Sequence, residues 1–215
     1  MKNATDITVL LDRSGSMDAI RMDTIGGFNT FLKGQQAVTG DAWLTLIQFD
    51  GHGYDTVIEH QPVASVLPLT LETFQPRGNT PLLDAMARTI DESGVRFERL
   101  DEVMRPDKVV VVIITDGLEN ASQRTTRGDV FAKVALQQDV YGWLFLYLGA
   151  NQDAIAVAAQ YGIASHHAAS YTANQAGTNA TYGAVSDAVT ARRAGASRRA
   201  VGFSAAQRSA MKGQS

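Results

Sequence analysis

The sequence predicts an α/β fold: a doubly wound, mostly parallel central sheet with one antiparallel edge hairpin strand and helices on both faces. The first observation is that apolar runs and helical stretches alternate along the 215 residues. The second is that several apolar runs are continuous, which is typical of strands buried on both faces. The third is a pair of strand-like runs separated only by "GHG", which indicates a hairpin.

The strands are predicted from β-rich apolar runs. They are expected at 6–12, 42–50, 54–66, 108–116 and 141–151, with a short last strand within 163–174. The run "KVVVVIITD" (108–116) has the most strand-like composition of the chain. The runs 42–50 and 54–66 flank "GHG" and form the predicted hairpin.

The helices are predicted from apolar residues at helical spacing. They are expected at 19–38, 80–104, 125–139, 153–162 and 181–193. In the first of these, Gly26 and Gly27 either weaken the helix or mark close packing against the sheet. Gly94 is a candidate break in the second.

Composition excludes several classes of protein. The chain has no cysteine, which excludes disulfide scaffolds, zinc ribbons and cysteine nucleophiles. The apolar run near the start is too short for a signal peptide, and no stretch reaches the ~20 apolar residues of a membrane span. These features predict a cytoplasmic protein without membrane contact.

Charge and composition change near the C-terminus. From residue 190 onward there are six basic residues and no acidic one, against 13 basic and 22 acidic residues before it. We expect one domain at 1–185 and a basic C-terminal helix or tail at 186–215. The tail has three interpretations: a solvated mobile segment, a segment that folds on a partner, or a nucleic-acid contact with Phe203 as its only aromatic.

Three polar clusters follow the ends of predicted elements. Asp12, Ser14 and Ser16 leave the first strand in "DRSGSM", Asp116 ends the fourth strand, and Thr80 begins a helix. In a doubly wound sheet, ligands bind where neighbouring crossovers leave in opposite directions. If the first and fourth strands adjoin, two carboxylates meet and repel unless a cation lies between them. Two carboxylates and three hydroxyls suit Mg²⁺, whereas the lack of sulfur and imidazole donors disfavours zinc and copper.

This pattern resembles the metal-ion-dependent adhesion site of von Willebrand factor type A domains, D-x-S-x-S…T…D. All five motif positions are filled, by Asp12, Ser14, Ser16, Thr80 and Asp116. The resemblance covers roughly residues 5–185. It implies a Rossmann-like fold in which the first and fourth strands adjoin, and a bound Mg²⁺ (sometimes Mn²⁺ or Ca²⁺) whose coordination an acidic residue of a partner completes. Without cysteines or a signal sequence, the chain looks like small intracellular bacterial or phage members that serve as assembly parts.

Each motif residue also has an ordinary structural interpretation. Ser16 or Asp18 is a candidate N-cap of the first helix. Thr80 before a proline is a candidate N-cap of the second helix. Asp116 before a glycine resembles a hairpin turn, although no alternating strand follows.

Further side chains near strand ends are candidates for the rim of the site or for turn and cap positions: Glu119, Asn120, Asp50 and Asp153. His166 and His167 lack a third ligand at useful spacing and are interpreted as ordinary histidines. We expect Trp43 and Trp143 to pack in or beside the core.

The leading hypothesis is a non-enzymatic module that binds an unknown protein partner through the metal. One alternative is a metal-dependent phosphatase or hydrolase with Asp12 as nucleophile, but Ser14 stands where such enzymes carry a second acid. The chain also has no phosphate-binding loop and no G-x-S-x-G motif. The other alternative is a regulatory subunit whose basic tail contacts nucleic acid.

Overall fold

The fold is built on one six-stranded sheet. The computed structural model describes residues 4–150 and 152–213. The strand order is β3-β2-β1-β4-β5-β6, and the strands are β1 (Thr5–Asp12), β2 (Ala42–Asp50), β3 (Gly53–Pro62), β4 (Lys108–Thr115), β5 (Leu144–Ala150) and β6 (Ala168–Tyr171). Every neighbouring pair is parallel except β2 and β3, which form the antiparallel edge hairpin. The predicted α/β fold is therefore confirmed, including the adjoining first and fourth strands.

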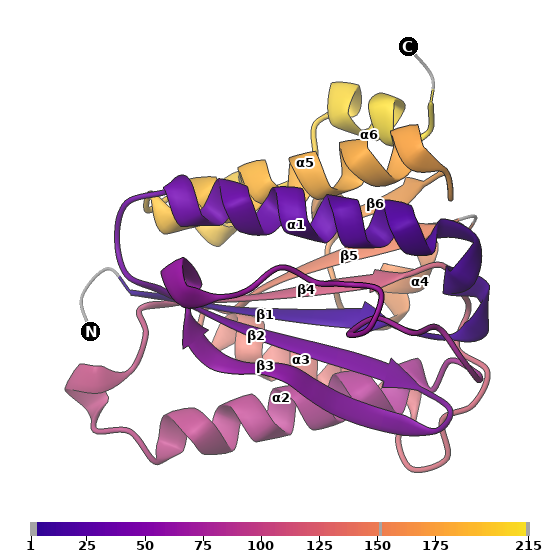
Figure 1. Cartoon of the computed structure of the whole chain (residues 1–215). Coiled ribbons are helices and arrows are strands. Elements are labelled where there is room, and N and C mark those ends of the chain that lie inside the picture. The colour runs from indigo at the N-terminus through magenta and orange to yellow at the C-terminus, as the bar shows by residue number, and fades with distance from the viewer. Residues whose placement is uncertain (1–3, 151, 214–215) are drawn as a thin grey trace.

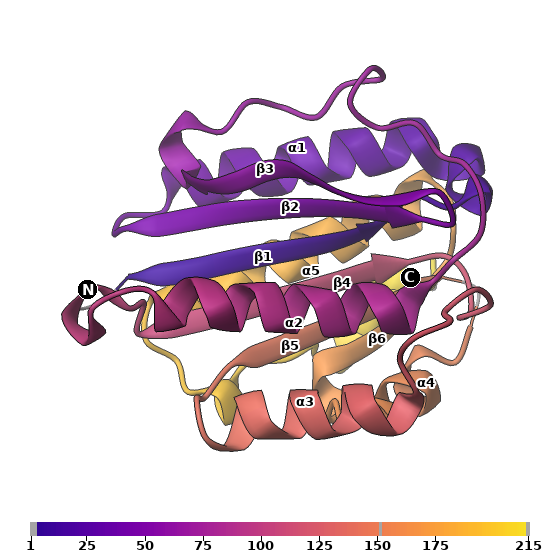
Figure 2. The same ribbon diagram turned by 90° about the horizontal axis from the view of Figure 1, so that it is seen from below.

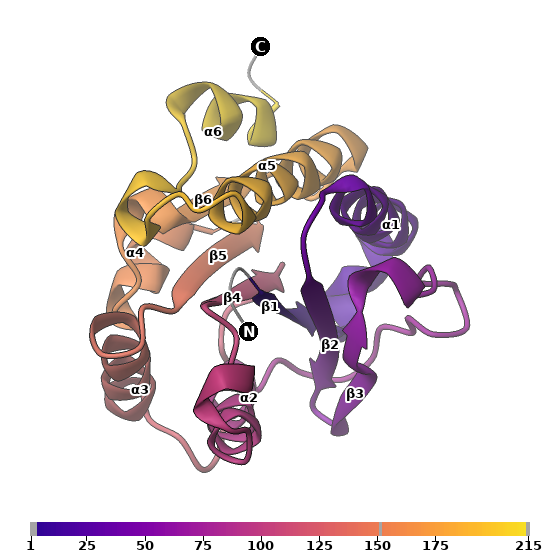
Figure 3. The same ribbon diagram turned by 90° about the vertical axis from the view of Figure 1, so that its left-hand side faces the viewer.

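Helices cover both faces of the sheet (Figures 1 and 3). The helices are α1 (Arg21–Ala37), α2 (Leu82–Glu98), α3 (Arg127–Asp139), α4 (Ala154–Gln160), α5 (Gln175–Arg193) and α6 (Ala205–Met211). One face carries α1 and α5, with α6 packed against α5, and Figure 2 shows α2 and α3 in front of the other face. Short 3₁₀ turns stand at Gly15–Ile20, Val63–Ser65, Glu102–Met104, Ser165–His167 and Arg198–Ala200.

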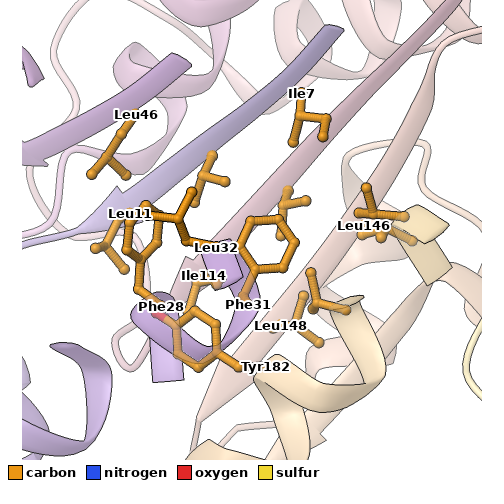
Figure 4. Packing of buried hydrophobic residues seen from close by; sticks show 14 of the residues in the cluster. Ile7, Leu11, Phe28, Phe31, Leu32, Leu46, Ile114, Leu146, Leu148 and Tyr182 are labelled. Carbon is orange, nitrogen blue, oxygen red and sulfur yellow. The ribbon is translucent and has the colours of Figure 1, made fainter. Parts of the chain in front are cut away.

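The core consists of two apolar layers, one on each side of the sheet. Figure 4 shows the layer under α1 and α5, where β-strand side chains such as Leu11 and Ile114 meet Phe28 and Phe31 of α1 and Tyr182 of α5. Leu10, one residue earlier in β1, belongs to the opposite layer with α2, α3 and α4. This alternation explains why β1 reads as an uninterrupted apolar run.

The glycine pair of α1 packs against a helix. A Cβ added at Gly27 would overlap the ring of Tyr182 in α5, whereas nothing lies within 4 Å of one added at Gly26. The expected close packing is therefore present, but against α5 and not against the sheet. Gly94 lies inside the continuous helix α2, so it is no break.

Some element boundaries differ from the prediction. A 3₁₀ turn at Gly15–Ile20 precedes α1, and α2 is shorter than the predicted 80–104 because the chain leaves the helix after Glu98. The helix predicted from 181 begins six residues earlier, at Gln175, with Asn174 as its side-chain cap. The predicted last residue of the 141–151 strand lies outside the described residues.

The C-terminal segment packs onto the domain. Val201, Phe203 and Met211 are at most 5% exposed, and the N–H of Thr172, just after β6, donates to the Met211 carbonyl. Of the three interpretations of the tail, a solvated segment does not fit, because three large apolar side chains of this otherwise small and polar segment are buried. The expected boundary between 185 and 186 falls inside α5.

The basic residues of this segment have structural partners. Arg193 donates to three backbone carbonyls at the end of α1 and after it. Arg192 reaches the Gly142 carbonyl, Arg198 the Gln138 side chain, and Arg208 the Ser165 carbonyl. The local excess of positive charge is therefore used largely in fastening the C-terminus.

None of the helices within the described residues is long and apolar enough to cross a bilayer.

Candidate metal centre

Four of the five motif residues lie at or just after the carboxyl ends of β1 and β4. These strands pair in parallel, with Leu11 opposite Ile114, so Asp12 and Asp116 emerge side by side. From this point the chain crosses from β1 to β2 on one side and from β4 to β5 on the other (Figure 1). The site therefore occupies the switch point of the sheet, where crevices form without any special loop.

Asp12 is held by two hydrogen bonds at the base of the site. Its Oδ1 accepts from the Ser14 N–H at 2.7 Å, and its Oδ2 accepts from the Thr115 hydroxyl at 2.6 Å. Asp12 has no exposed surface. The contact from Thr115 was not predicted, although alternation along the two paired strands places both side chains on the same face of the sheet.

Hydrogen bonds link the loop after β1 (residues 13–16, called the first loop below) to Asp116. The Ser16 hydroxyl donates to Asp116 Oδ1 at 2.7 Å across 100 residues of sequence. Ser14 Oγ and Ser16 Oγ lie 3.2 Å apart and share a hydrogen bond. Four of the five predicted residues are thus connected through their polar atoms.

Thr80 joins this group from a third segment. A Cβ built on Gly117 would lie 3.2 Å from Thr80 Oγ1 and 3.9 Å from Ser16 Oγ, so both hydroxyls border this glycine. Asn120 holds the backbone of Thr80, accepting from its N–H at 2.9 Å and donating to its carbonyl at 3.2 Å. All five predicted residues therefore converge.

The capping interpretations of the motif residues are wrong. Helix α2 begins at Leu82, with Pro81 at the N-cap position. Its first N–H groups are bound by side chains from the loop after β4: Leu83 donates to Glu119 and Asp84 to the Ser122 hydroxyl. These loop side chains take the capping role and leave the Thr80 hydroxyl to the cluster.

The same holds for the first helix and for the hairpin. No side chain caps the turn at Gly15–Ile20 or α1 by a hydrogen bond, and their N-cap positions are occupied by Ser14 and Ile20. After Asp116 the chain runs through a loop to α3, and β4 pairs with β1 and β5. The Asp-Gly hairpin is therefore excluded.

The other candidates near strand ends have structural roles. Glu119 accepts from the N–H groups of Ala121 and Ser122 besides binding α2. Asp153 caps α4 through the Ala156 N–H. Asp50 binds Arg13, as considered below.

The histidine pair does not form a metal site with its neighbours. Burial lowers the pKa of His167 to about 4, and its ring Nε2 lies 3.0 Å from the Arg198 carbonyl. Across residues 4–150 and 152–213, no group of three or more histidine, cysteine or carboxylate side chains is arranged to hold an ion. The motif cluster is of a different kind, because it combines two carboxylates with hydroxyls. Trp143 lies in the core, and Trp43 stacks on His60 at its edge.

Both carboxylates have a pKa raised above the ordinary value of an aspartate. Burial raises the pKa of Asp12 to about 6, and the charge of Asp116 adds to this, although hydrogen bonds from Thr115 and Ser14 oppose it. Burial also raises the pKa of Asp116 against the hydrogen bond from Ser16. A dication between the two groups would relieve both effects.

The donor set fits a hard divalent cation. Its members offer only oxygen, which Mg²⁺ and Ca²⁺ prefer and which Mn²⁺ accepts. Two carboxylates balance two positive charges, while neutral hydroxyls add donors without adding charge. Such a set leaves the ion free to accept a further anionic oxygen.

This chain is similar to known proteins in its fold. No family model and no curated protein matches the sequence. Proximal thread matrix protein 1 of the mussel byssus aligns over 87% of this chain and 46% of its own, at 14% identity and a TM-score of 0.59. The von Willebrand factor type A protein of Catenulispora acidiphila aligns over 89% of this chain and 43% of its own, at 15% identity and a TM-score of 0.57. The fold is that of a von Willebrand factor type A domain.

A third neighbour is aligned over nearly all of its own length, unlike the first two. The domain of the pilus tip protein Mfa5 from Porphyromonas gingivalis aligns over 86% of this chain and 94% of its own, at 10% identity and a TM-score of 0.58. The chain thus spans about half the length of the mussel and Catenulispora proteins. A further structure of the mussel protein has a zinc-occupied metal-ion-dependent adhesion site.

Proposed function

We propose that this chain is a non-enzymatic protein-interaction module in which Mg²⁺, held at the candidate metal centre, captures an acidic residue of a partner protein. Asp12, Ser14, Ser16, Thr80 and Asp116 are the proposed ligand residues. The metal supplies a positive centre that attracts a carboxylate, and the chain supplies the oxygen cradle around it. Mn²⁺ or Ca²⁺ could replace Mg²⁺, since the same donors suit them.

The observation that carries this proposal is the convergence of hydroxyls and two carboxylates from three distant segments. Ser16 and Asp116 touch across the switch point, and Thr80 borders them at Gly117. Helix capping does not explain this convergence. The first N–H groups of α2 bind Glu119 and Ser122, and no side chain caps the turn at Gly15–Ile20 or α1 by a hydrogen bond. A bound cation would stabilise the ionised form of Asp12 and Asp116, whose pKa values are raised.

The structural neighbours support the same class of function. The mussel matrix protein carries a metal at its adhesion site, and a pilus adhesin, SpaC from Lactobacillus rhamnosus GG, also aligns over 87% of this chain at a TM-score of 0.60. We infer protein binding for this chain by the same kind of site, with the partner defined only by its exposed carboxylate.

Calorimetric titration with Mg²⁺ of protein from which metal has been removed by a chelator tests the site. Native protein is expected to bind one ion, and Asp12→Ala is expected to bind none while keeping its far-UV circular dichroism. Asp18→Asn is the matched control, because Asp18 is an exposed acid of the same loop outside the ligand set. Metal uptake by Asp12→Ala equal to that of native protein would refute the assignment.

Capture of partners tests the interaction. Immobilised native protein is incubated with lysate of the source cells in Mg²⁺, in EDTA, and in EDTA followed by excess Mg²⁺. Partners are expected to be retained in the first and third conditions, and to be lost when Asp12→Ala is immobilised instead. Equal recovery with and without metal would remove the ion from the mechanism.

A further inference from the structure

Arg13 lies between two proposed ligand residues in the chain, and its side chain binds the buried Asp50 and the half-exposed Asp55. Arg13 is only 7% exposed. Its Nε donates to Asp50 Oδ2 at 2.7 Å, and its NH2 group donates to Asp55 Oδ2 at 2.6 Å. The side chain of Gln48 lies within hydrogen-bond reach of the same guanidinium at 3.4 Å.

Asp50 connects this arginine to a second one. Its side chain is completely buried, and its Oδ2 also accepts from Arg77 Nε at 3.0 Å. Its Oδ1 accepts from the His52 N–H at 2.6 Å. Burial works to raise the pKa of Asp50, but the His52 N–H and the two guanidinium groups hold it below its ordinary value. The carboxylate therefore stays ionised and keeps both arginines in place.

Backbone hydrogen bonds join the same segments as these ion pairs. The Arg13 N–H donates to the Phe49 carbonyl at 2.9 Å, and the Arg77 N–H donates to the Arg13 carbonyl at 2.8 Å. The Gly15 N–H donates to the Gly78 carbonyl at 3.0 Å. The first loop is thus joined to the end of β2 and to the segment that leads into Thr80.

Gly78 allows this junction to form. Its φ of 66° is the left-handed conformation that glycine tolerates best. A Cβ at this position would also lie 2.6 Å from His52 Nδ1. The segment from Arg77 to Thr80 can therefore pass closely over the β2–β3 turn, near the right-hand end of the strands in Figure 2.

We propose that Arg13 and Asp50 are positioning residues of the candidate metal centre. This inference rests on the proposed function. Asp12 and Ser14 flank Arg13 in the chain, so any rotation of the Arg13 peptide moves both. Mg²⁺ requires nearly ideal octahedral geometry at about 2.0–2.1 Å, and residues that hold ligands without touching the ion typically change metal affinity by about 10- to 100-fold. Arg13 and Asp50 hold the first loop in this manner, because Asp50 binds both Arg13 and Arg77 and so connects the first loop to the segment that leads into Thr80.

The test substitutes Arg13→Lys, which keeps the charge but loses the planar fork that reaches Asp50 and Asp55 together. We expect Mg²⁺ affinity, measured by calorimetry, to fall by about 10-fold or more. Amide hydrogen exchange of the metal-free protein is expected to rise at 13–16 and 77–80. This second readout needs no metal and reports the loop directly.

The matched control is the ion pair at the opposite end of β1. Arg96 of α2 binds the buried Asp6 at 2.9 Å and is remote from the candidate metal centre, since Asp6 lies near the start of the strand whose end carries Asp12. Arg96→Lys is expected to lower the melting temperature but to leave Mg²⁺ affinity and exchange at 13–16 unchanged. Arg77→Met, at a half-exposed arginine, is a milder variant and should weaken Mg²⁺ binding in the same direction by a smaller factor.

The outcomes separate the inference from the proposed function. Native protein that binds no Mg²⁺ would overturn both. Native protein that binds Mg²⁺ while Arg13→Lys and Arg77→Met bind it within twofold would overturn only the positioning role. An equal loss of affinity in Arg96→Lys would also overturn it, because the effect would then follow general destabilisation. If Arg13→Lys does not fold, Arg77→Met decides by the same two measurements.

Discussion

Replacing Asp12 with asparagine is expected to make the metal-free protein more stable. In the unfolded chain this carboxyl titrates at its ordinary pKa of 3.8, whereas in the folded chain burial raises its pKa to about 6. The folded state therefore binds more protons between these two values, and stability contributed by the neutral group is lost as pH rises through this window. At pH 7.5 Asp12 is ionised in both states, so the free energy of unfolding is lowered by the full amount. The pKa difference between 3.8 and about 6, at 1.36 kcal/mol for each pKa unit, gives about 3 kcal/mol.

Asparagine keeps the hydrogen bonds of Asp12 without the charge. Its side-chain oxygen can accept from the Ser14 N–H as before. The Thr115 hydroxyl, which now donates to Asp12, also lies 3.0 Å from the Gly117 carbonyl and can donate there while accepting from the asparagine amide. No buried polar group loses its partner, so the gain from removing the charge should appear almost in full.

The assay is urea unfolding of both proteins in EDTA and in Mg²⁺. In EDTA at pH 7.5, Asp12→Asn is expected to unfold with a free energy up to about 3 kcal/mol larger than that of native protein, and the difference should disappear near pH 3.5. Mg²⁺ at 100 times its dissociation constant should add about 2.7 kcal/mol to native protein and nothing to the variant. Asp18→Asn should follow native protein throughout. A variant less stable than native protein in EDTA, or one still stabilised by Mg²⁺, would contradict the reasoning.

Three further predictions concern the scaffold. Gly27→Ala should destabilise by about 1–3 kcal/mol in chemical unfolding through its overlap with Tyr182, while Gly26→Ala should be neutral or stabilising by up to about 1 kcal/mol; equal effects would refute the packing argument. His167 has a folded pKa of about 4 against an ordinary 6.5, so the unfolded state binds more protons between them and native stability should fall as pH drops below 6.5, by up to about 3 kcal/mol. His167→Phe should flatten that slope, and an unchanged profile would show that other groups cause it. Deletion of 196–215 should lower the melting temperature markedly without altering Mg²⁺ affinity, whereas an unchanged melting temperature would mean that the packed tail contributes nothing.

The sequence could predict the fold because each buried strand is a continuous apolar run. The position of the site follows from the same property. Once the first and fourth strands adjoin in parallel, their carboxyl ends are neighbours, and Asp12 at the end of β1 lies close to Asp116, which directly follows β4. Thr115 could also have been predicted, since alternation along β4 places it on the face of Asp12. These features are local, or they depend on one topological choice, and short-range patterns therefore suffice.

Other features depend on partners that no local pattern reveals. The caps of α2 come from Glu119 and Ser122, more than 30 residues away, so the serine, threonine and proline preferences at Thr80 pointed to the wrong capping residue. Arg13 and Asp50 are 37 residues apart, so no local pattern pairs them, although the position of Asp50 at a strand end made it a candidate for the rim of the site. The C-terminal segment resembles a solvated tail because only a few of its side chains are large, and it packs because those few are buried.

The mixture of donors suits a site that must persist without its ion. Burial already raises the pKa of both acids, and the charge of Asp116 raises the pKa of Asp12 further. A third carboxylate would add repulsion that the metal-free protein has no cation to offset. A hydroxyl avoids this cost because it can donate when no ion is present, as Ser16 does to Asp116, and can present a lone pair when one arrives. Three hydroxyls with two acids thus allow the loops to stay hydrogen-bonded in both states. With Arg13 anchoring the first loop from behind, the hydroxyls can reorient while the backbone that carries them stays in place.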